Sequence, residues 1–326
     1  MKNSFVLPAL AGLLFLSAAH GDVAFTNDFS SDPMQAGWQI HGDTNLFLWD
    51  QTNQNLAVTW DSSLPNSYFY QPLGVSVSKD DNFAIMFDLR LDDIGPGSDT
   101  NKPFSFNLSI GLLNHGEATQ PAFLRGTGVS SPDLAEFSYF WDSGFGATVW
   151  PVLVDSNSGF NFSSFEDYAI HELNNGDWYR VVMKYTGANH ALVTTLTNLT
   201  DTTGIVIHST LDSFFTDFNV DTLSISSFND TDGFGGSLLA RGAVDNVAVS
   251  VTLAPIKKLT GGLSNNVWQA NFVSQTNWLY TLERTTNFVS WSDSSPVTPG
   301  TPGTLTLSDT NPPTDGAFYR VRAERP

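Results

Sequence analysis

The chain contains no cysteine among its 326 residues. This absence excludes disulfide bonds, thiolate nucleophiles and thiolate metal sites. A cysteine-free protein outside the cell has to be stabilised by core packing or by bound ions. With 41% apolar and 13% aromatic residues, the chain has enough hydrophobic material for a sizeable core.

Charged residues are also scarce, and basic residues most of all. Only 14% of the residues are charged, against about 25% in a typical domain. Residues 22–256 carry 7 basic and 28 acidic side chains, a net charge of −21, whereas residues 257–326 carry 6 and 5, a net charge of +1. Such a field repels nucleic acid and anionic polysaccharides. We therefore expect neutral glycans or cations as ligands and no nucleic-acid partner.

No apolar run is long enough to cross a membrane. The longest, Phe5 to Leu16, follows Lys2 and precedes the small residues of 17–21. A spanning helix needs about 20 apolar residues, so this pattern predicts a signal peptide over residues 1–21. We expect export, with the mature protein secreted or at the cell surface and not inserted in a membrane.

Helical periodicity is nearly absent, and alternation of apolar and polar residues replaces it. Gly, Asn, Asp, Ser and Pro clusters bound each alternating segment. These patterns predict an all-β protein whose residues 22–253 form a large jelly roll. The segments are Asn82 to Leu91, Pro103 to Leu112, Trp178 to Thr186, His190 to Thr197, Val220 to Phe228 and Gly242 to Thr252.

A change of composition follows the last of these segments. Residues 254–262 predict a linker, and residues 263–326 predict a small β-sandwich module. Its expected strands are Val267 to Val273, Trp278 to Arg284, Gly303 to Ser308 and Ala317 to Ala323.

Short motifs in a fixed order resemble a known family. Residues 27–30 with 36–38, residues 176–182 and residues 244–249 together resemble a concanavalin A-like (laminin G-like) jelly roll over residues 22–253. Residues 278–283, 287–291 and 318–322 resemble the C-terminal, fibronectin type III-like β-modules of secreted proteins from Verrucomicrobia and related bacteria. The resemblance implies a secreted bacterial protein and says nothing about its activity.

The stretch LAEFSYFWD, residues 134–142, tests two chemistries of this fold. Hydrolases carry Glu-x-Asp-x-Glu on one strand, and here only Glu136 remains, with Asp142 about 20 Å further on. Legume lectins carry Val-Glu-Phe-Asp-Thr, and here Ser138 replaces the Asp that bridges the two metals. We assign no catalytic residue and favour a protein that is not an enzyme.

A third motif keeps an enzymatic alternative open. Gln39-Ile-His41 matches a short motif of one jelly-roll alginate lyase family. Lyase chemistry needs a base, a charge-neutralising Arg and a catalytic Tyr. The Arg-rich strand and the Tyr-containing strand of that family have no clear counterpart here.

Glycan binding through aromatic side chains is the hypothesis we favour. Alternation places Phe137, Tyr139 and Trp141 on one face of the strand, and Glu136, Ser138 and Phe140 on the other, which we expect to face outward. The candidate ligand contacts are Trp141, Trp150, Glu136 and Asp142.

A structural Ca²⁺ is the one cofactor the sequence suggests. Asp28 and Asp245 lie at the first and last strands, which run side by side in many jelly-roll domains and could share the ion. The acidic turn at residues 229–233 is a weaker candidate, because no bidentate Glu follows it.

The sequence therefore predicts a secreted, non-catalytic recognition protein that binds an extracellular or cell-surface neutral glycan through its jelly roll. Two alternatives stay open. One is a polysaccharide-degrading hydrolase or lyase, and the other is a structural or adhesive surface protein.

Overall fold

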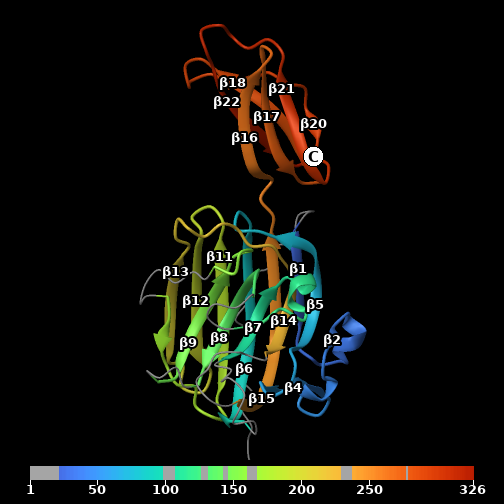
Figure 1. The fold of residues 1–326 in the computed structure, drawn as a ribbon, viewed down its shortest axis with the longest axis vertical. Coiled ribbons are helices and arrows are strands. Elements are labelled where there is room, and N and C mark those ends of the chain that lie inside the picture. The colour runs from blue at the N-terminus through green and yellow to red at the C-terminus, as the bar shows by residue number, and fades with distance from the viewer. Residues whose placement is uncertain are drawn as a thin grey trace, which may run out of the picture.

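A computed structural model describes residues 22–97, 107–125, 131–141, 146–159, 167–228, 237–276 and 278–326. Figure 1 shows two parts, a large β-sandwich and a smaller β-module, joined by one short connection. Within the described ranges, no helix is long and apolar enough to cross a membrane.

The first sheet of the sandwich has eight antiparallel strands, and its long central strands β6 and β15 pair with each other. The strand order is β13-β12-β11-β6-β15-β4-β3, and β1 pairs with β15 beyond the point where β4 ends. The bounds are β1 Asp22–Asn27, β3 Phe47–Asp50, β4 Asn55–Asp61, β6 Asn82–Pro96, β11 Trp178–Thr186, β12 Ala191–Asn198, β13 Gly204–Thr210 and β15 Leu238–Thr252.

The second sheet has seven strands in the order β10-β9-β8-β7-β14-β5-β2. Its strands are β2 Gln39–His41, β5 Ser67–Val77, β7 Asn107–Leu113, β8 Leu134–Phe140, β9 Thr148–Val154, β10 Ala169–Ile170 and β14 Val220–Ser227. Short helices complete the sandwich: η1 Pro33–Ala36, η2 Thr44–Leu46 and α1 His115–Ala118.

The main core fills the space between the two sheets, as alternation requires. In β11, for example, Tyr179, Val181, Met183 and Tyr185 are buried, while the residues between them are more exposed. Each such side chain contributes about 1.5–3 kcal/mol when it leaves water. The fold class predicted from the sequence, an all-β jelly roll with a small β-sandwich, is confirmed.

A second, smaller core lies on the outer face of the second sheet. Residues 115–125, which contain α1, fold across that face and bring Phe123 against Tyr68 and Phe228. Leu113, Leu134 and Val152 belong to the same cluster. Part of a sheet face that would otherwise meet solvent is therefore covered by the chain itself.

The C-terminal module packs one three-stranded sheet, β16-β17-β21, against a second sheet made of β18, β19, β20 and β22. Their bounds are β16 Ile256–Ser264, β17 Val267–Ser274, β18 Leu279–Thr285, β19 Ser292–Asp293, β20 Thr298–Pro299, β21 Gly303–Asp309 and β22 Phe318–Glu324. Most of the expected linker 254–262 is thus strand β16. Its outer residues are exposed because it is an edge strand, so no burial alternation marks it.

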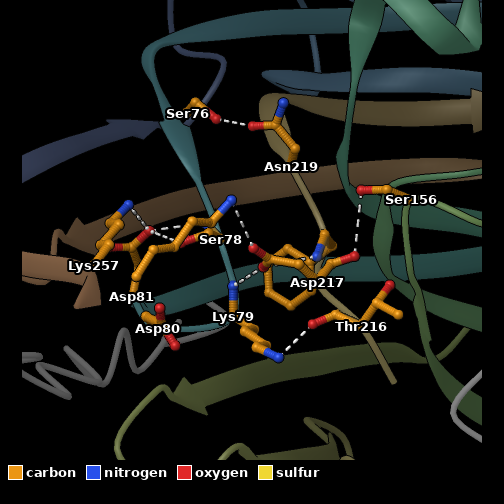
Figure 2. Close-up of polar contacts among 12 residues, drawn as sticks. Ser76, Ser78, Lys79, Asp80, Asp81, Ser156, Thr216, Asp217, Asn219 and Lys257 are labelled. Carbon is orange, nitrogen blue, oxygen red and sulfur yellow. Dashed lines mark hydrogen bonds and ion pairs between the residues drawn. The ribbon is translucent and has the colours of Figure 1, made fainter. Parts of the chain in front are cut away.

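The junction between the two parts is held by polar contacts, and those of Asp81 are buried (Figure 2). Asp81 is fully buried, accepts hydrogen bonds from the Ser78 and Ala254 backbone N–H groups at 2.7 Å each, and forms an ion pair with Lys257. Lys258 lies 3.6 Å from Asp217, whose carboxylate also accepts the Lys79 N–H at 3.0 Å. The first residues of the module are therefore anchored to the end of the sandwich.

Candidate functional site

Residues 134–140 of the stretch LAEFSYFWD form β8, which lies between β9 and β7 in the second sheet. Phe137 and Tyr139 point into the main core, as predicted, and Glu136 lies on the opposite face. That face is not open to solvent here. Glu136 is fully buried and its Oε2 lies 2.9 Å from Nη2 of Arg125, which comes from the covering segment. We therefore leave Glu136 out of the candidate site, because no ligand can reach it in this structure.

Burial has a strong effect on this carboxyl group. It raises the pKa of Glu136 to about 7, although the Arg125 charge and the Ser109 hydroxyl act in the opposite direction. Arg125 also lies over the ring of Phe228, at 4.9 Å from its centroid. The pair pins the covering segment to the sheet, which is a structural role.

The other residues predicted for the ligand site remain predictions. Trp150, on β9, lies on the same face as Ser138 and stacks on Phe140 at 5.2 Å. Trp141 follows β8 and is half-buried. Asp142 and the acidic turn 229–233 lie outside the described residues.

An open groove lies on the same outer face, over the three strands at the opposite edge of the sheet. It has a volume of about 550 Å³ and runs along β2, β5 and β14. Register places Gln39 directly opposite Tyr70, so both side chains point the same way. The Tyr70 hydroxyl donates a hydrogen bond of 2.9 Å to Oε1 of Gln39. We call this feature the sheet groove.

His115, the first residue of α1, forms one wall of the sheet groove. Its backbone N–H donates to Asp221 at 3.0 Å, and its ring lies 4.4 Å from that of Tyr70. Its Nε2 is buried and has no hydrogen-bond partner among the described residues. Burial, with a smaller effect from His41, lowers the pKa of His115, so the imidazole is neutral at pH 7.

A smaller hollow of about 200 Å³ is lined by His41, by Pro65 and Asn66, and by residues of the covering segment. The His41 ring stacks on Tyr68 at 5.8 Å and lies 6.3 Å from the ring of His115. No Lys or Arg lines either hollow, and Asp221 is the one carboxylate of the described lining. The site thus presents rings, an amide, hydroxyls and a single acceptor carboxylate.

Comparison with known proteins gives a likeness of fold. No protein-family model matches the chain, and no curated protein matches its sequence. Among solved structures it is similar to a seed lectin of Lotus tetragonolobus, with a TM-score of 0.46 and 12% identity over 71% of this chain and 99% of the lectin. Its solved neighbours are legume lectins.

Two further lectins are similar over the same share of this chain. Lectin II from Ulex europaeus gives a TM-score of 0.46 with 14% identity over 71% of this chain and 99% of its own. Lectin I from the same plant, solved with the methyl glycoside of α-L-fucose, gives a TM-score of 0.41 with 14% identity over 71% of this chain and 98% of the lectin. At these identities the likeness concerns the fold alone.

Of the two aspartates proposed for calcium, Asp28 directly follows β1 and Asp245 lies on the neighbouring strand β15. Pairing of Asn27 with Val247 places Asp28 beside the bulge at Asp245 and Asn246. Asp28 accepts two hydrogen bonds from Ser30, which lower its pKa. Burial, then the charges of Asp88 and Asp28, raises the pKa of Asp245 to about 6. In the described part of the chain, no group of three or more His, Cys, Asp or Glu is arranged to hold a metal.

Sequence reasoning missed the sheet groove, although Gln39 and Tyr70 of its lining were noticed. Gln39 and His41 drew attention only as a short lyase-like motif, and Tyr70 only as one of many aromatic residues. Four chain segments, from β2, β5, α1 and β14, form the site. A useful signal exists in hindsight, since alternation places Gln39 with His41, and Tyr68 with Tyr70, on shared faces.

Proposed function

We propose that the protein recognises a neutral glycan through the sheet groove without chemically changing it. The observation that carries this proposal is the lining itself. Tyr70 offers an apolar ring, Gln39 an amide and Asp221 a carboxylate that can accept hydrogen bonds from sugar hydroxyls, and the described lining contains no Lys or Arg. A site for an anionic polysaccharide would require Lys or Arg.

The electrostatics of the whole domain favour the same class of ligand. The sandwich carries a large negative charge, and the imidazole of His115 is uncharged at neutral pH. An uncharged ligand approaches such a surface without repulsion. We further propose that the protein is exported and acts outside the cell, as residues 1–21 indicate.

A glycan array with matched variants tests this proposal. We expect Tyr70→Ala to weaken binding of at least one neutral glycan about tenfold or more, because it removes the ring and the contact to Gln39. Tyr70→Phe should have a smaller effect, since it keeps the ring. Trp178, half-buried on the outer face of the opposite sheet beside Arg90, supplies the control Trp178→Ala. Equal binding by Tyr70→Ala and wild type would show that the sheet groove is not the site.

The second candidate function is polysaccharide cleavage by β-elimination. The observation in its favour is that Gln39 and His41 meet Tyr70 and His115, which together supply a base and a phenol. Against it, the described lining has no cation to neutralise a uronate carboxylate. Release of unsaturated ends from a polyuronate, followed by ultraviolet absorbance, would decide for the enzyme.

We also propose that Asp28 and Asp245 share a structural Ca²⁺. The raised pKa of Asp245 means that its contribution to stability is full below about pH 4 and is lost as the pH rises through about 6. Without Ca²⁺, Asp245→Asn should therefore stabilise the sandwich at about pH 8, by about 1–2 kcal/mol because the carboxylate is partly exposed. This gain should vanish near pH 4.

Thermal melting at about pH 8, with Ca²⁺ or with EDTA, completes the test. A bound cation would remove the repulsion, so Ca²⁺ should raise the melting temperature of the wild type and leave that of Asp245→Asn unchanged. An equal response of the two proteins to Ca²⁺ would place the ion elsewhere. If Ca²⁺ changes the melting temperature of neither protein, the calcium proposal is wrong.

A further inference from the structure

The C-terminal module has a groove of its own, of about 620 Å³. It lies where β16 turns into β17 and where β21 gives way to β22, which is the end of the module farthest from the sandwich (Figure 1). We call it the distal groove. It includes Leu263, Asn266, Trp268, Asn311, Pro313 and Tyr319. Among the described residues that line it, the Tyr319 phenol is the one ionisable group.

Aromatic side chains form the floor of the distal groove. Trp268 from β17 and Tyr319 from β22 stack across the two sheets with ring centroids 3.9 Å apart and planes within 8°. A Cβ at position 261 would lie 2.6 Å from the Trp268 ring, so Gly261 is required for the indole to lie where it does. Nearby, the exposed rings of Phe288 and Phe318 also pack together, at 3.9 Å.

A buried carboxylate fixes this geometry before any ligand binds. Asp309 is 3% exposed and accepts hydrogen bonds from the Tyr319 hydroxyl at 3.0 Å, from Arg284 at 2.8 Å and from the Asn311 N–H at 3.0 Å. Arg284 also donates to the Asn311 carbonyl at 2.7 Å. The Tyr319 ring and the loop at Asn311 are therefore held in place before a ligand binds, which lowers the entropic cost of binding.

Polar groups in the groove are free to meet a ligand. The side-chain amide of Asn266 and the indole N–H of Trp268 have no hydrogen-bond partner in the part of the chain that the structure describes. Asn266 has a φ of 61°, in the left-handed region, as the second residue of the Asn265–Asn266 turn. The groove thus combines stacked rings with unpaired amide and N–H groups and carries no charge.

We propose that the distal groove is a second, independent binding site for a neutral glycan. Rings provide apolar surface for the C–H faces of pyranose units, and amides bind their hydroxyls. An uncharged lining selects an uncharged ligand, because a charged one would be desolvated without a partner. The protein would then hold two glycan sites, one on each part, and an increase in avidity would follow for a long chain that spans both.

The test uses the full-length protein with Tyr70→Ala, so that only the distal groove remains competent. The probes are soluble neutral hexasaccharides of glucose, mannose and xylose, with titration calorimetry and tryptophan fluorescence as readouts. We expect at least one of them to bind this protein. Adding Asn266→Gly, which keeps the left-handed backbone and removes the amide, should weaken binding about fivefold for one lost hydrogen bond. Adding Trp268→Leu should abolish it.

Trp278→Leu is the matched control, because Trp278 lies at the opposite end of the module against Arg325 and should leave binding unchanged. Failure of every hexasaccharide to bind, or unchanged affinity in the Asn266→Gly protein, overturns the proposal. Capture of a proline-rich peptide that the same substitutions abolish would also overturn it, by assigning a different ligand class. The sheet groove is judged separately: if Tyr70→Ala alone removes all glycan binding, the distal site fails and the sheet groove stands.

Discussion

Replacing Arg125 with Met should destabilise the sandwich by about 3–5 kcal/mol at about pH 8, and by clearly less at about pH 5.5. The ion pair of Arg125 and Glu136 is buried, with side chains 4% and 0% exposed, so removing the cation leaves a carboxylate in an apolar layer. Glu136 can escape this cost by taking up a proton. The pH dependence is therefore the signature of the mechanism.

The direction of this pH dependence follows from the pKa of Glu136. Burial raises it to about 7 in the folded protein, so the contribution of this group to stability is full below about pH 4.5 and is lost as the pH rises through about 7. Loss of the Arg125 charge raises the pKa of Glu136 further and extends the decline in stability to higher pH. Urea unfolding of each variant at the two pH values measures the effect.

Two more variants separate this mechanism from simple loss of packing. Glu136→Gln mimics the protonated carboxyl group, so its unfolding free energy should be close to that of the wild type in acid and should rise relative to the wild type as the pH increases through about 7, the opposite pH dependence to Arg125→Met. The double variant Arg125→Met with Glu136→Gln has no buried charge and should recover most of the stability. An Arg125→Met protein equally destabilised at both pH values would contradict the account.

The same experiment bears on function. Arg125 pins one end of the segment that covers the sheet, and His115 in the sheet groove lies at the other end. If the covering segment loosens, the wall of the groove loosens with it. We therefore expect Arg125→Met to weaken glycan binding at about pH 8 in a folded protein, through the position of His115.

The strands could be predicted from the sequence where one face is buried and the other is exposed to solvent. The segment from Trp178 to Thr186 was predicted to the residue, because β11 alternates buried and more exposed side chains along its whole length. The strand β16 was taken for a linker, because seven of its nine residues are exposed and two of them are glycines. Alternation of apolar and polar residues marks a strand that buries one of its faces. An edge strand whose side chains are exposed therefore lacks this pattern in its sequence.

The site was less readable, for a related reason. Alternation placed Glu136 on the outer face of β8, but nothing local to β8 could show that residues 115–125 lie across that face. The sheet groove depends on which strands pair, and β2 pairs with β5, whose sequence begins 26 residues after the end of β2. His115 belongs to no motif in the sequence. It can be recognised as a site residue only from the fold, which brings its ring beside that of Tyr70.

Replacing Asp81 with Ala should have the second large effect, on both the stability of the sandwich and the position of the C-terminal module. The change removes the acceptor of two backbone N–H groups, from Ser78 and Ala254, and the counter-ion of Lys257. We expect a loss of about 3–5 kcal/mol, with the ammonium group relieving part of it by moving into solvent. Differential scanning calorimetry, which resolves the transitions of two domains, is the appropriate measurement.

Such a movement of Lys257 would release the start of β16 from the end of the sandwich. We therefore expect small-angle scattering of Asp81→Ala to show a wider distribution of distances between the two parts than in the wild type. Asp80→Ala is the control at the adjacent position (Figure 2). The Asp80 side chain is a third exposed and lies 3.7 Å from Nε2 of His190. This substitution should change the unfolding free energy by less than about 1 kcal/mol and leave the scattering unaltered.

Removing both charges tests whether the ion pair itself sets the orientation. Asp81→Asn with Lys257→Met has no buried ion and keeps an acceptor for the backbone N–H groups, so stability should return to near the wild-type value. If the scattering of this double variant also matches the wild type, the backbone hydrogen bond to Ala254 fixes the module and the ion pair is dispensable. If the distances stay broad while stability returns, Lys257 is the anchor. A wild-type scattering curve from Asp81→Ala would contradict both, and would mean that the connection at residues 253–255 is stiff without any help from Asp81.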